Sequence, residues 1–147
     1  MSGEKIETVR EAFHLWGLNP DGGLAPIDLA RIREVFEGDT TAASKIFDPD
    51  VEIHPPTGVS GGPRRGYQGL VRNWQDLLTT FDEYLLDPIE FQDAGDQVVV
   101  IQRNIGRTRE MELDETFSVL FSFRDGRILR IQVFPSRDGA REAAALA

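Results

Sequence analysis

Cysteine is absent from the sequence, which excludes disulfide bonds and thiolate metal sites. Long hydrophobic runs are absent too: no segment approaches the roughly 20 apolar residues of a membrane span, so no membrane partner is expected. Histidine is scarce, and its two residues fall on different predicted elements, so we expect no metal centre. The N-terminus is polar and partly acidic, unlike a signal peptide, which predicts a cytoplasmic protein.

Positive charge is in short supply. The 147 residues include 16 Lys and Arg against 25 Asp and Glu, which gives a net charge of −9. Such a surface repels the phosphates of nucleic acids and of anionic membranes, so neither is an expected partner. The run Gly61-Gly62-Pro63 lacks the Gly-Lys-Ser/Thr of a phosphate-binding loop, and no cofactor is implied. The length is that of one domain.

The strongest pattern in the sequence is an amphipathic helix from Gly66 to Phe81. Its apolar residues recur at i, i+3, i+4 and i+7 and form one stripe, most of which we expect in the core. Gly66 and Gly69 lack a Cβ, so the first turn can lie close to another backbone. Tyr67 and Trp74 also carry a polar group. We expect them to line a pocket, with core packing as the alternative.

Three shorter helices are predicted before this one. They are predicted at about residues 4–18, 26–37 and 40–47. The first carries Phe13 and Trp16 on its apolar stripe. Pro26 is a favourable first-turn residue for the second.

The segment between these helices and the main helix is irregular. Asp48-Pro49-Asp50 is typical of a turn, and a short strand at residues 51–54 ends at Pro55-Pro56. Residues 57–65 are rich in glycine and proline, and we expect them to form a mobile loop.

Four strands and a closing helix are predicted after the main helix. Pro88 indicates an edge or a bulge in the first strand, and Asp125-Gly126 is a strong signal for a two-residue hairpin. Helices followed by an antiparallel meander indicate an α+β fold rather than α/β. The strands are predicted at residues 84–92, 97–105, 112–124 and 127–134, and the helix at 140–146.

Several short motifs occur together in an order that resembles the SnoaL-like (polyketide cyclase-like) proteins of the nuclear transport factor two-like superfamily. The resemblance covers about residues 27–147 and implies a cystatin-like cone, in which a curved antiparallel sheet wraps around helices and encloses an apolar pocket. It also implies a homodimer through the outer sheet face. Residues 1–25 would be an extra helical arm on a domain of residues 26–147, capping the pocket or reaching a partner subunit. The motifs are Phe47–His54, Gly66–Gly69, Asp93–Val100, Arg124–Ile128 and the closing alanine-rich helix.

The resemblance also implies where chemistry would sit. Characterised relatives include polyketide cyclases, ketosteroid isomerases and limonene-epoxide-type hydrolases. The isomerases place a carboxylate base at the end of the first strand, before a proline, and the matching residue here is His54, whose ordinary pKa suits proton transfer. Relatives place further carboxylates in the third and last meander strands, where this chain has Val119 and Val133 instead. The usual pair of carboxylates is therefore missing.

Other residues are expected to bind a ligand rather than to react with it. By comparison with the isomerases, Gln102 and Asn104 are expected to be polar groups of the pocket, with a dimer face as the alternative. Val119 and Val133 would form apolar wall, and Phe13 and Trp16 would reach the pocket from the first helix.

Two functions remain open at this point. In the first, the protein is an enzyme that carries out proton transfer, cyclisation or isomerisation of a cyclic or polyketide-like substrate, with His54 as base. In the second, it is a non-catalytic module that binds a small apolar or cyclic molecule, or another protein. The His-Pro pair and the glycine-rich loop favour the enzyme, whereas the missing carboxylates favour the binding module.

Overall fold

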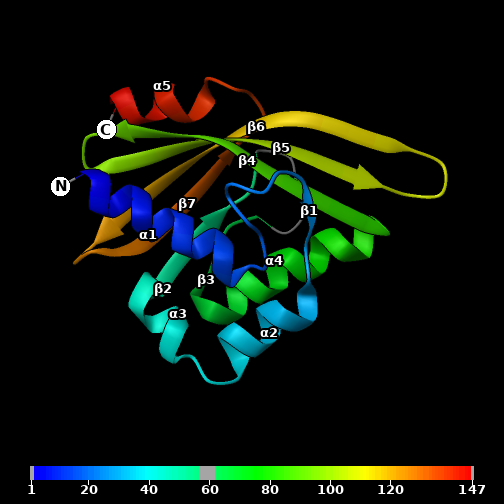
Figure 1. The fold of residues 1–147 in the computed structure, drawn as a ribbon, viewed down its shortest axis with the longest axis horizontal. Coiled ribbons are helices and arrows are strands. Elements are labelled where there is room, and N and C mark those ends of the chain that lie inside the picture. The colour runs from blue at the N-terminus through cyan, green and yellow to red at the C-terminus, as the bar shows by residue number, and fades with distance from the viewer. Residues whose placement is uncertain (1, 57–61, 147) are drawn as a thin grey trace.

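A curved seven-stranded sheet wraps around helices in the computed structural model of the chain (Figure 1), which describes residues 2–56 and 62–146. The α+β class predicted from the order of elements is confirmed. Residues 57–61, part of the loop predicted to be mobile, lie outside the described residues. In chain order the elements are α1 (Ser2–Leu15), β1 (Ala25–Pro26), α2 (Leu29–Glu37), α3 (Thr41–Ile46), β2 (Phe47–His54), β3 (Arg64–Arg65), α4 (Gly66–Thr80), β4 (Glu83–Ala94), β5 (Gln97–Arg107), β6 (Glu112–Arg124), β7 (Arg127–Phe134) and α5 (Gly139–Leu146).

The strands lie in the order β1-β4-β5-β6-β7-β2-β3. Strands β4 to β7 form the predicted antiparallel meander, and β2 pairs parallel to β7. Asp125 and Gly126 connect β6 to β7 with φ angles of 53° and 80°, which confirms the hairpin prediction. The register of β4 shifts between Pro88 and Glu90, the irregularity that the proline indicates. Bulges of this kind bend a strand and so contribute to the curvature of the sheet.

The concave face of the meander is apolar. Val100 of β5 lies opposite Val119 of β6, and Val119 lies opposite Val133 of β7. Alternate residues of a strand point to the same face, so these side chains form a row across three strands. Val100 and Val119 are buried in the main core together with side chains of α1 and α4.

Helix α4 packs against the concave face through Leu70, Val71 and Trp74. Its first turn depends on glycine at two positions. Gly66 has a φ of +77°, which an L side chain rarely adopts, and a Cβ on Gly69 would lie 3.1 Å from the carbonyl carbon of Arg64. The close backbone approach predicted for these glycines is therefore present at Gly69.

Helix α1 also lies on the concave face, beside the sheet (Figure 1). Val9, Phe13 and Trp16 are almost fully buried and belong to the same core as α4 and the meander. The division into an extra helical arm of residues 1–25 and a domain of residues 26–147 stays a prediction. In the described part of this arm, the apolar stripe forms one wall of the main core.

The start of α2 differs from the prediction. Ala25 and Pro26 pair with β4 as the edge strand β1, so Pro26 does not open the helix. Asp28 is the N-cap, and its Oδ1 accepts a hydrogen bond from the backbone N–H of Arg31 at 3.2 Å. Pairing of Pro26 with β4 moves the start of the helix to the residue after its N-cap Asp28.

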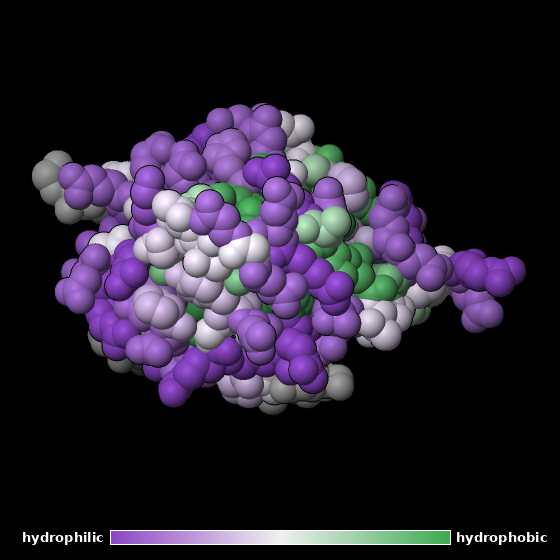
Figure 2. Space-filling view, turned by 90° about the horizontal axis from the view of Figure 1, so that it is seen from below, coloured by the Kyte–Doolittle hydropathy of each residue, from purple (hydrophilic) through white to green (hydrophobic). Residues whose placement is uncertain are grey.

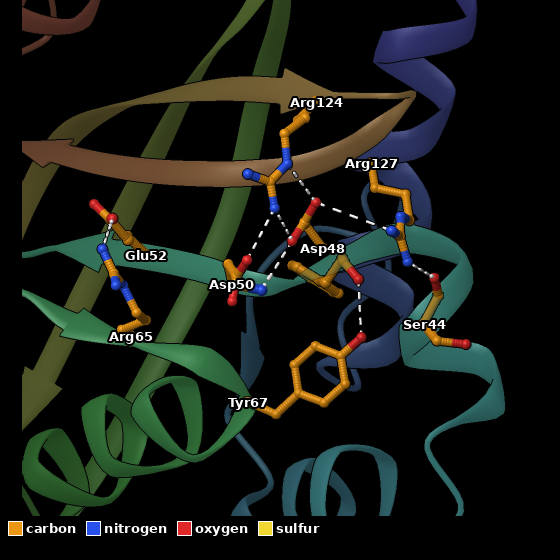
Figure 3. Close-up of polar contacts among 9 residues, drawn as sticks. Ser44, Asp48, Asp50, Glu52, Arg65, Tyr67, Arg124 and Arg127 are labelled. Atoms are coloured by element: carbon orange, nitrogen blue, oxygen red, sulfur yellow. Dashed lines mark hydrogen bonds and ion pairs between the residues drawn. The ribbon is translucent and has the colours of Figure 1, made fainter.

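Asp48-Pro49-Asp50 lies within β2 rather than in a turn, which corrects another prediction. The buried Asp48 carboxylate accepts two hydrogen bonds from Arg124 of β6, at 2.8 and 2.9 Å (Figure 3). These bonds lower the pKa of Asp48 below its ordinary value, so the group stays ionised. Arg124 also reaches Asp50 at 3.0 Å. These ion pairs attach this part of β2 to Arg124 at the end of β6, which keeps the segment from forming a turn.

Helix α5 covers part of the opposite, convex face (Figure 1). Val99, Ile101 and Leu120 point to this face and pack beneath Ala140 of the helix. The family resemblance implies a homodimer through this outer face. Because α5 covers the apolar strip of Val99, Ile101 and Leu120, that strip does not support the homodimer, which stays a prediction.

The packing of α5 can be tested with one substitution at two positions. Ala140 is fully buried and Ala145 is exposed on the same helix. Ala140→Asp is expected to lower the free energy of unfolding by about 2 kcal/mol or more, because it buries an unpaired charge. Ala145→Asp should change it by less than about 0.5 kcal/mol. Urea unfolding measures both, and equal losses would contradict the packing of α5.

Candidate functional site

A cavity of about 590 Å³ lies between α4 and the concave face of the sheet. Side chains from α1, α4 and strands β2 to β7 line it, and most of them are apolar. Four buried aromatic residues of the lining form one group of contacting rings, here called the aromatic end: Phe13, Trp16, Trp74 and Phe121.

The aromatic end joins α1, α4 and β6 through ring contacts. The ring centroids of Trp16 and Trp74 lie 5.4 Å apart at an interplanar angle of 63°. Phe13 contacts Trp16 edge-on at 5.3 Å and Phe121 at 6.2 Å. Such edge-to-face contacts stabilise aromatic pairs beyond the area they bury. These contacts hold the rings that line this part of the cavity in place.

Both indole N–H groups at the aromatic end are buried donors. Trp16 and Trp74 are 3% and 6% exposed, and within residues 2–56 and 62–146 neither Nε1 atom has a hydrogen-bond partner. A buried donor without an acceptor costs free energy. At the aromatic end, the described residues thus provide no acceptor for either indole N–H group.

A polar wall runs along one side of the cavity. It consists of Tyr84 on β4 and Asn104 and Gln102 on β5, all of them buried. Gln102 Nε2 donates to Asn104 Oδ1 at 3.0 Å, and Asn104 Nδ2 donates to the Tyr84 hydroxyl at 2.7 Å. Burial raises the pKa of Tyr84, and the hydrogen bond from Asn104 only partly opposes that shift. The phenol is therefore neutral at physiological pH.

The charged residues of the cavity lie at its more exposed rim. Arg64 of β3 and Asp76 of α4 form an ion pair there. Phe81, just after α4, lies against Gly106, where an added Cβ would come within 2.6 Å of the ring.

On the face shown in Figure 2, hydrophobic side chains gather beside the projecting end of the sheet.

His54 is not among the residues that line the cavity, and its role as a base stays a prediction. Strand alternation in β2 places Ile53 in the cavity wall and His54 on the other face. His54 Nε2 lies 2.9 Å from Glu52 Oε1, and an ionised carboxylate only accepts, so Nε2 carries the hydrogen. The resemblance placed His54 correctly along the strand but gave no information on the face to which it points.

Glu52 is the centre of this outer cluster. Its carboxylate accepts hydrogen bonds from His54 and from Arg65, the latter at 2.8 Å (Figure 3), and Arg130 lies 3.7 Å away. The hydrogen bonds from His54 and Arg65 lower the pKa of Glu52 to about 2. The cluster joins β2, β3 and β7 across the outside of the sheet.

Tyr67 is also placed outside the cavity lining. Its hydroxyl donates to the backbone carbonyl of Phe47 at 2.8 Å (Figure 3), and its ring packs edge-on against Phe36 at 5.6 Å. Tyr67 therefore attaches the start of α4 to β2. The alternative of a packing role, left open from the sequence, describes its contacts better.

The structure brings most of the other predicted residues together at the cavity. One residue of the polar wall, Tyr84, was not anticipated. Tyr84 is the second residue of β4. Because the register of β4 shifts after Pro88, the sequence does not show which residues of this strand face the cavity, and the position of Tyr84 beside Asn104 follows only from the strand pairing. The predicted residues that line the cavity are Phe13, Trp16, Trp74, Gln102, Asn104, Val119 and Val133.

Within residues 2–56 and 62–146, no three or more His, Asp or Glu side chains are grouped so that they could hold a metal ion. In the same part of the chain, no helix combines the length and the apolar character that crossing a membrane requires.

Comparison with known proteins gives a family match and a set of similar structures. The family model of the SnoaL-like domain matches residues 30–131. A putative SnoaL-like polyketide cyclase from Jannaschia sp. CCS1 is 20% identical with a TM-score of 0.62, over 90% of this chain and 85% of that one. An NTF2-like protein from Burkholderia xenovorans LB400 is 17% identical with a TM-score of 0.65, over 98% of both chains. No curated protein matches the sequence.

TerC, in a crystal structure obtained with polyporic acid, is a third similar structure. It is 21% identical with a TM-score of 0.64, over 97% of this chain and 98% of that one. At these identities the three structures are similar to this chain in fold. The alignments of this chain with the NTF2-like protein and with TerC extend over almost its whole length. The family match, in contrast, starts within α2.

The Glu52 cluster predicts how stability depends on pH. A carboxylate whose pKa is lowered on folding stabilises the protein above its unfolded value near 4.5, and this stabilisation is lost as the pH falls towards 2. The side chain of Glu52 is 23% exposed, so solvent screening limits the effect, and Glu52→Gln should cost about 1 kcal/mol at pH 6. Urea unfolding should show this difference shrinking between pH 4.5 and pH 2. A difference that stays constant would contradict the ionic role of Glu52.

Proposed function

The chain belongs to the SnoaL-like domain family, and on that premise we propose that its cavity binds a small, mostly apolar organic molecule with a ring system. The family resemblance read from the motifs is confirmed by the family match. The observation that carries the proposal is the cavity itself, about 590 Å³ in volume and lined largely by apolar and aromatic side chains.

The size and lining of the cavity fit a ligand of this kind. Binding sites for small molecules are typically clefts of about 300–1,000 Å³ with an apolar lining and a few polar groups that orient the ligand. The aromatic end offers flat surfaces for a ring, and the polar wall offers hydrogen bonds on one side only. A ligand with one polar edge and an apolar body matches this arrangement.

The placement of His54 supports binding over proton transfer through that residue. A general base must come within about 3 Å of the proton that it removes, directly or through one water. His54 instead faces the Glu52 cluster on the outside of the sheet. Among the described residues of the lining, the one carboxylate is Asp76, which is paired with Arg64 at the rim. We therefore propose a binding function, with His54 as a residue of the outer cluster.

The two tryptophans of the chain provide the readout for this proposal. The sequence holds two Trp, and both lie at the aromatic end of the cavity. Ligand binding should therefore change the intrinsic fluorescence of the unlabelled protein. The probes are 9-fluorenone, an aromatic ketone that quenches indole emission, and polyporic acid, the compound of the TerC crystal structure.

Substitution of Val119 tests whether the ligand occupies the cavity. Val119 is 3% exposed and lies in the middle of the lining. Val119→Phe should fill cavity space and weaken binding of 9-fluorenone about tenfold or more. Val119→Ala enlarges the cavity and should keep the affinity within about threefold. Cooperative urea unfolding of both variants shows that they are folded, and unchanged affinity in a folded Val119→Phe variant would contradict the proposal.

His54→Ala separates the two functions that the sequence left open. If the cavity binds a ligand without His54, the affinity of the variant for 9-fluorenone should stay within about twofold of the wild type. The same variant is then compared with the wild type in a turnover screen of cyclic ketones, enones and polyketide-like aromatics. A loss of turnover of about 10²–10⁴-fold would restore His54 as a base and overturn its assignment to the outer cluster.

A further inference from the structure

The polar wall of the cavity is a chain of hydrogen bonds with a direction. Each amide in it donates to the next residue: Gln102 to Asn104, and Asn104 to the hydroxyl of Tyr84. The three side chains are 5%, 6% and 4% exposed, so bulk water does not supply their remaining hydrogen bonds. This chain of hydrogen bonds ends at the phenol of Tyr84, which accepts a hydrogen bond from Asn104 and still carries its own proton.

The Tyr84 hydroxyl is therefore a donor at the cavity wall for which the described residues, 2–56 and 62–146, provide no acceptor. A phenol oxygen that accepts a hydrogen bond becomes a stronger donor, because bonds in a chain polarise one another. The phenol also keeps its proton, since burial raises the pKa of Tyr84. The polar wall thus presents a hydrogen-bond donor, the hydroxyl of Tyr84, to a ligand in the cavity.

The aromatic end contributes rings rather than donors. The indole Nε1 atoms of Trp16 and Trp74 have almost no accessible surface, although both residues line the same cavity as Tyr84. The Tyr84 hydroxyl is therefore the donor that matters among these three residues. A ligand that brought only donors would leave it unpaired.

Charge narrows the ligand class further. A buried carboxylate on the ligand would need a cationic partner. Within the described lining the cation is Arg64, which already pairs with Asp76 at the rim. A neutral acceptor oxygen needs only a donor, and the polar wall supplies one. Carbonyl oxygens of ketones, quinones and esters are neutral groups that accept without donating.

We propose that the ligand class is a neutral ring compound with a carbonyl oxygen, and that the hydroxyl of Tyr84 donates the hydrogen bond that selects it. This inference rests on the proposed binding function of the cavity. It assigns Tyr84 as the specificity-determining residue and leaves the aromatic end to bind the ring. Asn104 and Gln102 are positioning residues, because they hold the phenol and direct its proton.

A pair of probes with one ring skeleton tests the role of the oxygen. 9-Fluorenone carries a carbonyl where fluorene carries a CH₂ group. Affinity for 9-fluorenone is measured by quenching of tryptophan fluorescence, and affinity for fluorene by its displacement of 9-fluorenone. The wild type should bind 9-fluorenone about five- to tenfold more tightly than fluorene, the ratio expected for one net hydrogen bond.

The variant Tyr84→Phe removes the donor and keeps the ring. Its affinity for 9-fluorenone should fall about five- to tenfold, while its affinity for fluorene stays within about twofold. The matched control is Tyr67→Phe, since Tyr67 is the other tyrosine of the chain and its hydroxyl bonds to Phe47 outside the cavity lining. That variant should keep the wild-type ratio.

An infrared measurement keeps the test independent of the folding of Tyr84→Phe. The carbonyl stretch of 9-fluorenone bound to the wild type should lie at lower frequency than in a hydrocarbon solvent, as it does for a hydrogen-bonded ketone. Absence of this shift, or an unchanged affinity ratio in folded Tyr84→Phe, would overturn the inference while the proposed function stands. Binding of neither probe to the wild type would overturn the proposed function and the inference with it.

Discussion

The concave face of the sheet is apolar across three strands, and the fold depends on covering it. Helices α1 and α4 do so together, and they meet through the contact of Trp16 with Trp74 at 5.4 Å. Where the aromatic rings pack, the core is closed; between the rest of α4 and the sheet, a cavity of about 590 Å³ is left. The cavity is thus a consequence of how two helices cover a curved surface.

Strand alternation then sorts the polar chemistry between two faces of one sheet. In β5 it directs Gln102 and Asn104 into the cavity, where Tyr84 of β4 joins them. In β2 it directs Ile53 inward and His54 outward to Glu52. The inner set is neutral and buried, which suits recognition of a neutral ligand. The outer set is charged and partly exposed, which suits the joining of strands at the sheet edge.

Strongly periodic segments could be predicted from the sequence, and face assignments could not. The stripe of α4 and the alternation of β6 gave these elements almost residue by residue, because one buried face dictates the pattern. Pairing with β4 turned Ala25–Pro26 into strand, and ion pairs with the distant Arg124 hold Asp48 and Asp50 within β2; nothing local signals such partners. The register shift after Pro88 concealed that Tyr84 faces the cavity, and the apolar stripe of α1 does not indicate which core the helix joins. The resemblance located His54 at the end of β2 without indicating the face to which it points.

The central claim is that the space between the aromatic end and the polar wall is a ligand site. The most direct measurement is a ¹H–¹⁵N spectrum of the wild type titrated with 9-fluorenone, in which the indole N–H groups of the two Trp give separate signals. Trp16 and Trp74 both line the cavity, so both signals should shift with one shared Kd. Indole signals that stay in place while amides of the convex face shift would contradict the account.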